Sequence, residues 1–400
     1  MSFNIALSGI QAINQQLEAV SNNIANAGTY GYKSSRANFA SLYAGAQANG
    51  VEVGSMTQNI GLTGSMNSTG RALDAAIEGR GFFVARDAQG AVAYTRVGIF
   101  SSNSDGYLVD AIGRKVQGYG PAVGGAAMGV MGDIKIPTGQ IAAQASSKVS
   151  FVGNLSADWK TPTATPFDHT DPNSYNMVKQ SVLYDSLGTQ HTVSQYFVKS
   201  PAPAVNTVEV YYGFDGAAPA AGANTTLTFD SAGQLPALTS SGALTLTPTN
   251  GAADINFEID YTGTTQFAGE PTTTTNSTDG YAAGTFLGIE LAPNGSVLAK
   301  YSNEQQQVVG TVAIATFADE GALTQVSDTS WTANTSSGAP LYGTPGSGLA
   351  GRLNTGTLEG SNVDITSELV GLMTSQRNYQ ANSKVITTQN QMMQSLMQAL

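Results

Sequence analysis

Apolar residues recur at heptad spacing at both ends of the chain. Near the N-terminus the steps alternate between three and four, at Phe3, Ala6, Ile10, Ile13, Leu17, Val20, Ile24 and Ala27. Near the C-terminus the steps are seven, at Ile365, Leu372, Tyr379, Ile386, Met393 and Leu400, with Leu369 and Leu396 as further apolar candidates. This spacing predicts a coiled-coil helix at each terminus.

Both predicted helices carry very few charges. Residues 1–32 contain only Glu18, and residues 365–400 contain only Glu368, Arg377 and Lys384. A coiled coil usually flanks its apolar stripe with Glu and Lys. Helices without that charge are neither strongly solvated nor able to bury their apolar residues alone, which indicates association with other copies.

The alternative is that the two helices form the core of a monomeric globule. Polar residues, Gln376, Ser383 and Asn390, interrupt the second apolar pattern at heptad steps. Polar residues at such positions cost stability and are best attested as specifiers of register and oligomeric state. We therefore favour assembly, with the apolar positions of both helices as the polymerisation interface.

Local signals place the ends of these helices. The first is expected from Ser2 to Ala27, with Gly28 as its C-terminal stop. Asp364 can cap the second helix, which is expected to continue to the end of the sequence. Residues 31–70 show no clean periodicity and are interpreted as an extended connecting segment, with a hairpin around Asn49-Gly50.

The middle of the chain repeats one turn device, an Asp or Asn followed by Gly between alternating apolar runs. It occurs at 87–90, 105–106, 185–188, 230–233 and 294–295. Such residues tolerate the positive φ of hairpin turns, so the pattern predicts five hairpins and an all-β middle. The predicted fold is mainly β with long α-helical termini.

Changes in composition suggest four regions. Residues 1–30 and 360–400 form a terminal helical domain, and residues 71–145 with 285–359 form an inner β-domain. Residues 146–284, rich in Thr, Ala, Gly and Pro, form an outer β-domain inserted into the inner one. Two β-domains in series, one inside the other, imply a chain that runs outward and returns.

Composition narrows the possible functions. The chain has 400 residues, a net charge of −11 and only 11% charged residues. No Lys or Arg lies between Lys199 and Lys300, which argues against nucleic-acid binding there. There is no Cys, no basic segment before Lys33 typical of a secretory signal, and no apolar run long enough to span a membrane.

Candidate chemistry is weak throughout. Gly346, Gly348 and Gly351 fit G-x-G-x-x-G, but the flanking residues predict a loop rather than a strand and a helix. The two histidines, His169 and His191, are too few for a recognisable zinc site. The acids Asp254, Glu258 and Asp260 cluster on a solvated strand, and G-x-S-x-G does not occur. We expect no enzyme, no cofactor and no bound metal.

Two terminal motifs resemble the signatures of bacterial flagellar rod and hook proteins. The N-terminal motif contains Asn22, Asn23, Asn26, Gly31, Tyr32 and Lys33. The C-terminal motif contains Asn362, Asp364, Gln376, Arg377, Tyr379 and Gln380. Segments 73–77, 81–83, 106–109 and 118–119 are similar to the β-domain that this family shares.

Segments 182–188 and 196–199 are similar to the extra domain of the hook members, which shorter distal rod members lack. The resemblance implies a subunit of a curved tube that transmits torque from rod to filament. It implies contacts with copies of itself, the distal rod protein, the hook cap, the hook-filament junction protein and the flagellar type III export apparatus. It places the chain in the hook, outside the cell and exported without a cleavable signal. The alternatives are a distal rod subunit, or a secreted β-rich adhesin or hydrolase.

Overall fold

The structure is a computed structural model that describes residues 2–44, 47–121, 128–201, 206–220, 224–236 and 239–399. The chain divides into two compact units. Unit 1 comprises Met1–Thr138, Gly288–Lys300 and Gln306–Leu400, and unit 2 comprises Gly139–Leu287 and Tyr301–Gln305. Strands fill most of the chain and one long helix lies at each end. The predicted fold class, mainly β with α-helical termini, is confirmed.

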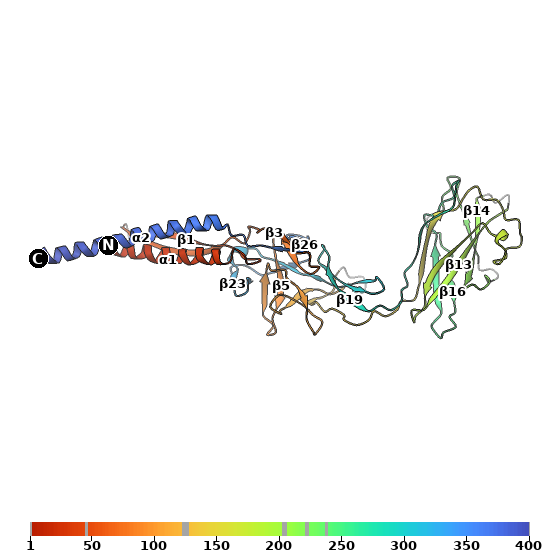
Figure 1. Cartoon of the computed structure of the whole chain (residues 1–400), viewed down its shortest axis with the longest axis horizontal. Helices are drawn as coiled ribbons and strands as arrows, with labels where there is room; N and C mark the ends of the chain where they lie inside the picture. Colours follow the sequence, from red (N-terminus) through yellow and green to blue (C-terminus); the bar gives the residue numbers. More distant parts are fainter. Residues whose placement is uncertain are drawn as a thin grey trace. The chain divides into compact units, whose positions relative to one another are not determined.

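The terminal helices α1 (Ser2–Ala25) and α2 (Ile365–Ala399) lie side by side in unit 1 (Figure 1). The first helix ends earlier than expected. Asn26 donates its side-chain amide to the carbonyl of Asn22 and accepts a hydrogen bond from the Thr29 hydroxyl, which favours a turn over further helix. The first glycine after α1 that has a positive φ is Gly31, at +70°, and not Gly28, the predicted stop.

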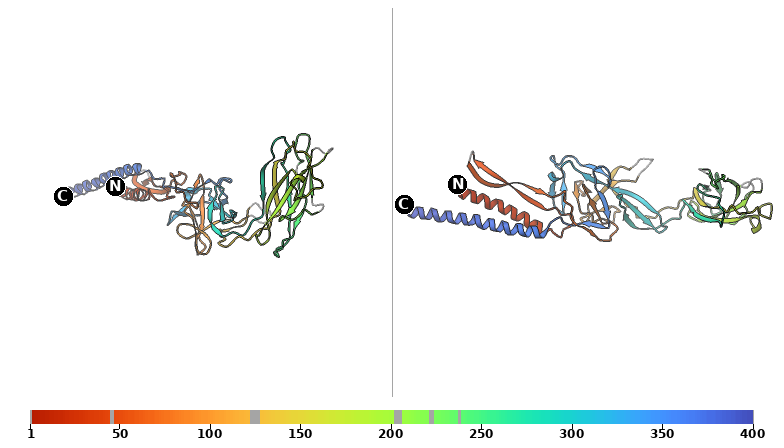
Figure 2. Two further views of the ribbon diagram at one scale, coloured as in Figure 1. Left: turned by 45° about the vertical axis from the view of Figure 1, so that its right-hand side comes forward. Right: turned by 90° about the horizontal axis from the view of Figure 1, so that it is seen from above.

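Residues 31–70 are not the plain extended segment expected. Strands β1 (Ser35–Ala44) and β2 (Gln47–Gln58) form a long antiparallel hairpin that contacts α1 (Figure 2, right). Asn49 and Gly50 lie within β2 and do not form its turn. Register shifts at Asn38/Phe39 and Leu42/Tyr43 break the two-residue alternation, which is why the sequence showed no strand period.

The β-part of unit 1 is built on one large sheet. Its main path is β19 (Phe286–Leu291), β20 (Ser296–Tyr301), β21 (Gln306–Val312), β9 (Lys115–Tyr119), β5 (Phe82–Arg86), β6 (Val92–Thr95), β24 (Ser330–Thr332) and β23 (Thr324–Val326). Pairing off this path are β10 (Met131–Asp133), β22 (Ile314–Thr316), β25 (Leu341–Gly343), β7 (Ser101–Ser102) and β8 (Leu108–Val109). Its buried aromatic core holds Phe82 against Phe317 and Trp331, with ring centroids 6.1 and 5.3 Å apart.

Short elements complete unit 1. The strand pairs are β26 (Arg352–Thr355) with β4 (Ala75–Glu78) and β27 (Thr357–Glu359) with β3 (Met66–Ser68), and η2 (Glu320–Ala322) is a 3-10 turn. The pair β27–β3 leads directly into the residues that precede α2. These strands therefore connect the sheet to the helix pair.

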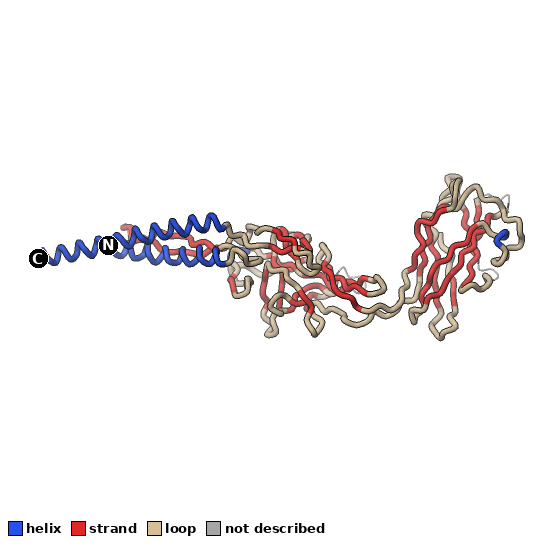
Figure 3. Tube along the Cα trace, viewed as in Figure 1, coloured by secondary structure: helices blue, strands red, loops and turns tan. Residues whose placement is uncertain are grey.

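Unit 2 is a β-sandwich of two sheets, apart from the 3-10 turn η1 (Pro172–Ser174) (Figure 3). One sheet runs β16 (Leu244–Leu246), β17 (Ile255–Asp260), β11 (Lys148–Asn154) and β18 (Thr272–Thr278). The other runs β12 (Met177–Tyr184), β13 (Gln190–Lys199), β14 (Thr207–Phe214) and β15 (Asn224–Thr228). Alternate residues of both sheets, such as Phe151, Phe197 and Phe257, meet in one buried core.

Four of the five predicted hairpin turns join neighbouring strands. They link β5 to β6, β7 to β8, β12 to β13 and β19 to β20. The turn at 230–233 is wrong as a hairpin, although Gly233 has the expected positive φ of +72°. The strand before it, β15, pairs with β14, and the next one, β16, pairs with β17 in the other sheet. A turn signal fixes local backbone shape, but tertiary pairing decides the partner.

Candidate assembly surface of the terminal helices

The helices α1 and α2 pack antiparallel in a constant register. The side-chain amide of Asn23 donates to the Glu368 carboxylate at 2.8 Å, near the β-part of unit 1. At the other end, a Cβ on Gly9 would lie 3.2 Å from the Asn382 side chain. Since both contacts fit one register, the two helices stay in contact along most of α1.

The candidate interface residues of α1 are only partly used within the chain. Ile13 and Val20 are buried, and Ile10, Leu17 and Ile24 are half-buried. Phe3 is 41% exposed, and its neighbours Ile5 and Leu7 are similarly exposed. The apolar stripe of α1 is therefore wider than the surface that α2 and the hairpin cover.

The candidate residues of α2 are mostly exposed. Leu372 and Ile386 are half-buried, while the rest of the set within the described residues is exposed: Ile365, Leu369, Tyr379, Met393 and Leu396. Leu400 lies outside the described residues. The surface of α2 that meets α1 uses smaller or polar residues instead, such as Gly371, Ser375 and Asn382. A helix with only three charged residues thus presents a row of large apolar side chains to solvent.

The polar residues of the second heptad pattern lie along the same helix. Gln376 and Asn390 are exposed, and Ser383 is half-buried. Gln376 and Asn390 therefore lie outside the buried contact with α1. Their proposed effect on register therefore concerns contacts outside this chain.

Asn23 joins the helix pair to the hairpin. Its amide donates to the Ser35 carbonyl and to Glu368, and its carbonyl accepts from Ser35 N–H and the Tyr32 hydroxyl, all within 3.2 Å. Burial raises the pKa of Tyr32, which keeps this hydroxyl protonated as a donor. The Asn23 side chain therefore joins α1, α2 and β1 at one point, here called the junction.

A buried ion cluster lies next to this point. Glu359 accepts from Lys33 at 2.6 Å and from Arg96 at 3.4 Å, and all three side chains are at most 1% exposed. Burial lowers the pKa of Lys33, although the Glu359 carboxylate opposes that effect. Lys33 comes from the N-terminal motif, but no pattern in the sequence predicted Glu359 or Arg96 as its partners. Glu359 lies 326 residues after Lys33 and 263 residues after Arg96, so only the fold brings it to them.

The C-terminal motif also has structural roles before α2. Asn362 accepts from Ser34 N–H at 2.7 Å and donates to the carbonyls of Asn59 and Leu62. Asp364 caps α2 by accepting from Thr366 N–H at 2.9 Å, as its position in the sequence predicted. The Ser367 hydroxyl also donates to Asp364, and these bonds lower the pKa of its carboxyl.

The remaining motif residues on α2 are exposed: Gln376, Arg377, Tyr379 and Gln380. Within the described residues, these four side chains form no hydrogen bond or ion pair, although Tyr379 is only 39% exposed. They are placed where a second chain could reach them. The C-terminal motif therefore has two parts. Asn362 and Asp364 hold the start of α2 in place, and the other four residues are exposed on the helix.

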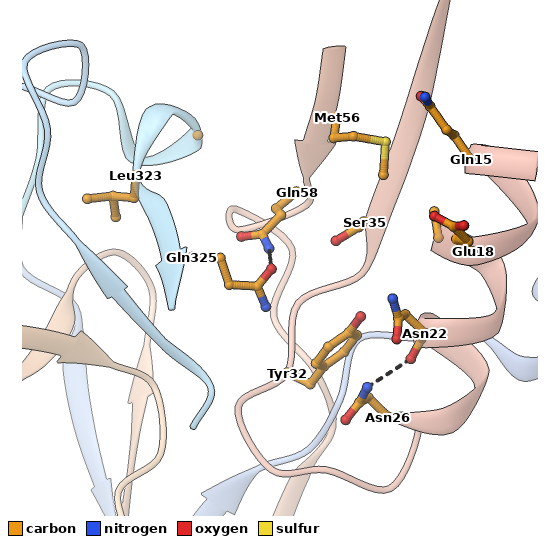
Figure 4. Close-up of a pocket in the computed structure, with 12 residues that line it drawn as sticks. Gln15, Glu18, Asn22, Asn26, Tyr32, Ser35, Met56, Gln58, Leu323 and Gln325 are labelled. Carbon is orange, nitrogen blue, oxygen red and sulfur yellow. Dashed lines mark hydrogen bonds between the residues drawn. The ribbon is translucent and has the colours of Figure 1, made fainter. Parts of the chain in front are cut away.

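A cavity of about 660 Å³ opens beside the junction, between α1, the base of the hairpin and the β-part of unit 1 (Figure 4). Its lining is mostly neutral and polar, with Gln15, Asn22, Gln58 and Gln325 among its amides and Glu18 as an acid. Gln58 donates to Gln325 across it. This lining contains no nucleophile paired with a base, so it offers no catalytic arrangement.

The other chemical candidates have structural surroundings. Gly346, Gly348 and Gly351 lie in the turn between β25 and β26. His191 Nδ1 lies 2.8 Å from Asp215, and Lys148 pairs with Asp260 at 2.8 Å, while Glu258 and Asp254 are exposed. Among the described residues, no His, Cys, Asp and Glu side chains group as a metal site, and no helix is long and apolar enough to cross a membrane.

Four family models match successive parts of the chain. Residues 3–33 match "Flagella basal body rod protein", and 76–157 match "Flagellar hook protein FlgE/F/G D1 domain". Residues 154–281 match "Flagellar basal body protein FlaE D2 domain", and 354–399 match "Flagellar basal body rod FlgEFG protein C-terminal". The terminal matches include both motifs of the junction and helix α2.

Full-length relatives decide the family. The chain is 37% identical over 408 residues to the flagellar hook protein FlgE of Salmonella typhimurium, with 99% of each chain covered. It is 36% identical to the FlgE of Escherichia coli K12, again with 99% of each chain covered. The chain belongs to the flagellar hook protein FlgE family. This agrees with the resemblance carried by its terminal motifs.

A more distant relative is also similar along nearly the whole chain. The hook protein FlgE of Brucella suis is 31% identical over 397 residues, covering 98% of this chain and 96% of the relative. The crystal structure of Helicobacter pylori flagellar hook protein FlgE2 aligns with a TM-score of 0.52 at 14% identity. It covers 73% of this chain and all of that one, which supports the FlgE fold.

Proposed function

We propose that this chain is the structural subunit of a bacterial flagellar hook, which polymerises into a curved, flexible tube. The observation that carries the proposal is the helix pair with few charges and large exposed apolar side chains, found in a member of the FlgE family. A surface of this kind marks a protein interaction site. Its similarity along the whole chain to hook proteins favours this role over that of a distal rod subunit.

Cohesion of the tube would come from the helices. Each fully buried large apolar side chain contributes roughly 1.5–3 kcal/mol, so several of them from each copy suffice for a stable polymer. The interface comprises the candidate set predicted from the heptads, whose exposed members include Phe3, Ile365 and Leu396. Torque is transmitted from rod to filament through these contacts.

Bending would come from the β-domains. The tube bends on every revolution, so each row of subunits lengthens and shortens cyclically. The chain carries only 11% charged residues, so its outer surfaces can slide over one another without breaking many ion pairs. We assign 71–145 with 285–359 to an inner β-domain and 146–284 to an outer one, around an inner tube of 1–30 and 360–400.

Family membership supports further proposals about partners. They are the distal rod protein, the hook cap and the hook-filament junction protein at the ends of the tube. The flagellar type III apparatus would export the chain to the outside of the cell without a cleavable signal. A hook subunit needs no catalytic group, and we propose that this chain is not an enzyme.

Electron microscopy of the purified protein after polymerisation tests the proposal, and curved tubes are the expected result. Leu369→Asp with Met373→Asp places two charges on exposed positions of α2 and is expected to abolish the tubes. Thr272→Asp with Thr274→Asp is the matched control on an exposed strand of unit 2, and tubes should persist. Failure of the wild-type chain to form any tube would overturn the proposed function.

A further inference from the structure

The C-terminal part of α2 extends past the described part of α1. In the register set by Asn23 with Glu368 and Gly9 with Asn382, Ser2 lies opposite residue 389. Residues 390–399, here called the overhang, therefore have no residue of α1 opposite them within the described chain. At 1.5 Å per residue the overhang is about 15 Å long.

The overhang carries a dense apolar surface. Met392, Met393, Leu396 and Met397 are 53%, 57%, 56% and 76% exposed. Their spacing of one, three and four places them on one face of the helix. That face continues the side of α2 on which half-buried Ile386 and Gln389 lie, so it is the α1-facing side carried beyond α1. The overhang thus lacks a helix of the α1 kind to pack against.

A groove of matching character lies on the same unit. It has a volume of about 490 Å³ and lies along α1, between the hairpin and α2. Its floor is formed by Ile5, Gly9 and Ile13 of α1, and its walls include Phe39 and Val51 of the hairpin. None of its lining residues is charged.

We propose that the overhang of one copy docks in the groove of the next copy, as a head-to-tail contact between terminal helices. This rests on the proposed polymerisation and names the two surfaces that meet in it. Both surfaces are uncharged, so neither contains an ion that docking would desolvate, and the groove adds the amides of Gln16, Asn378 and Asn382 to its apolar lining. Each chain has one overhang and one groove, so the contact is head-to-tail and can repeat from copy to copy to build a row of subunits.

The three methionines suit this contact in a tube that bends. Methionine is unbranched and flexible, and fills irregular gaps with little loss of packing. The distance between successive subunits changes as the tube rotates, so the overhang must fit the groove in more than one position. A branched side chain such as Ile would fit only one of these positions well.

Cysteine cross-linking tests the proposal, because the chain contains no Cys of its own. Gln16 lines the groove and Met393 lies on the overhang. In one chain their positions are separated by about 27 Å along the helix axis, far beyond the 7 Å that a disulfide can bridge. In tubes of the Gln16→Cys/Met393→Cys variant we expect a ladder of linked chains on a non-reducing gel, and no links in the monomer.

A matched variant, Asn14→Cys/Met393→Cys, places the first thiol on an exposed position of α1 outside the groove, and at least tenfold fewer links are expected. Tubes without cross-links, or with dimers as the largest product, would overturn the docking while the proposed function stands. If the double variant does not assemble, each single variant is mixed into wild-type tubes. The expected product is then a Gln16→Cys to Met393→Cys dimer, and its absence would equally overturn the proposal.

Discussion

At the scale of single residues, the carboxylate of Glu359 pairs with two buried cations, Lys33 and Arg96. Glu359→Gln would leave Lys33 and Arg96 buried without a counter-charge, so we expect unit 1 to lose about 3–5 kcal/mol of stability. The measurement is urea unfolding followed by the fluorescence of Trp331, which lies in the core of unit 1, in a Trp159→Phe background.

Glu290→Gln is the control for that measurement. Glu290 pairs with Lys300, but both side chains are more than 40% exposed, so the change should stay within about 0.5 kcal/mol. An unchanged urea midpoint for Glu359→Gln would show that the Glu359 carboxylate does not stabilise unit 1 by pairing with Lys33 and Arg96. The charges would then be compensated in another way.

Asp260 gives unit 2 a defined response to acid. Hydrogen bonds from Lys148 and Thr262 lower the pKa of Asp260 from 3.8 to about 2. The unfolded chain binds this proton more readily than the folded one, so the stabilisation is present above about pH 4 and is lost as the pH falls toward 2. Calorimetry of Asp260→Asn should show a lower unfolding temperature at pH 7 and a flatter dependence between pH 4 and 2. Asp254→Asn, an exposed neighbour, should keep the wild-type dependence.

At the scale of elements, we expect the polar positions of α2 to control when the helix associates. Replacing Gln376, Ser383 and Asn390 by Leu would complete an apolar stripe along α2, since two of the three are exposed. The triple variant is expected to form soluble oligomers or aggregates before any tube appears. Sedimentation velocity at low concentration measures this, with the triple Ala variant as a monomeric control. A triple Leu variant that stays monomeric and builds normal tubes would contradict the expectation.

The elements also show what the sequence could and could not predict. The heptads predicted both helices because one apolar period persists for many residues. The hairpin β1–β2 was not predicted, because its bulges at Asn38/Phe39 and Leu42/Tyr43 disturb the strand period. The ion cluster around Glu359 was not predicted, because Lys33 is 326 residues from Glu359 and only the folded chain brings the two side chains together. For the same reason, the heptads marked apolar positions without showing which of them α1 and α2 cover within one chain.

At the scale of the whole molecule, the helices are expected to be dispensable for folding and required for assembly. A fragment of 31–363 keeps the Lys33–Glu359–Arg96 cluster and the pair β27–β3. It should therefore be a folded monomer that forms no tubes, as measured by sedimentation and electron microscopy. A fragment of 71–358 lacks Lys33 and Glu359 and leaves Arg96 unpaired, so its unit 1 should unfold at lower urea. Tubes from either fragment would show that the terminal helices are not the assembly element.

Two β-bridges where the chain enters and leaves unit 2 give that unit a further property. Ile141 pairs antiparallel with Gly284 and Gln144 pairs with Tyr281, so the chain enters and leaves unit 2 side by side. A domain connected in this way behaves as a cassette. It can be enlarged, reduced or exchanged for another domain whose ends lie equally close, while the register of α1 on α2 is untouched.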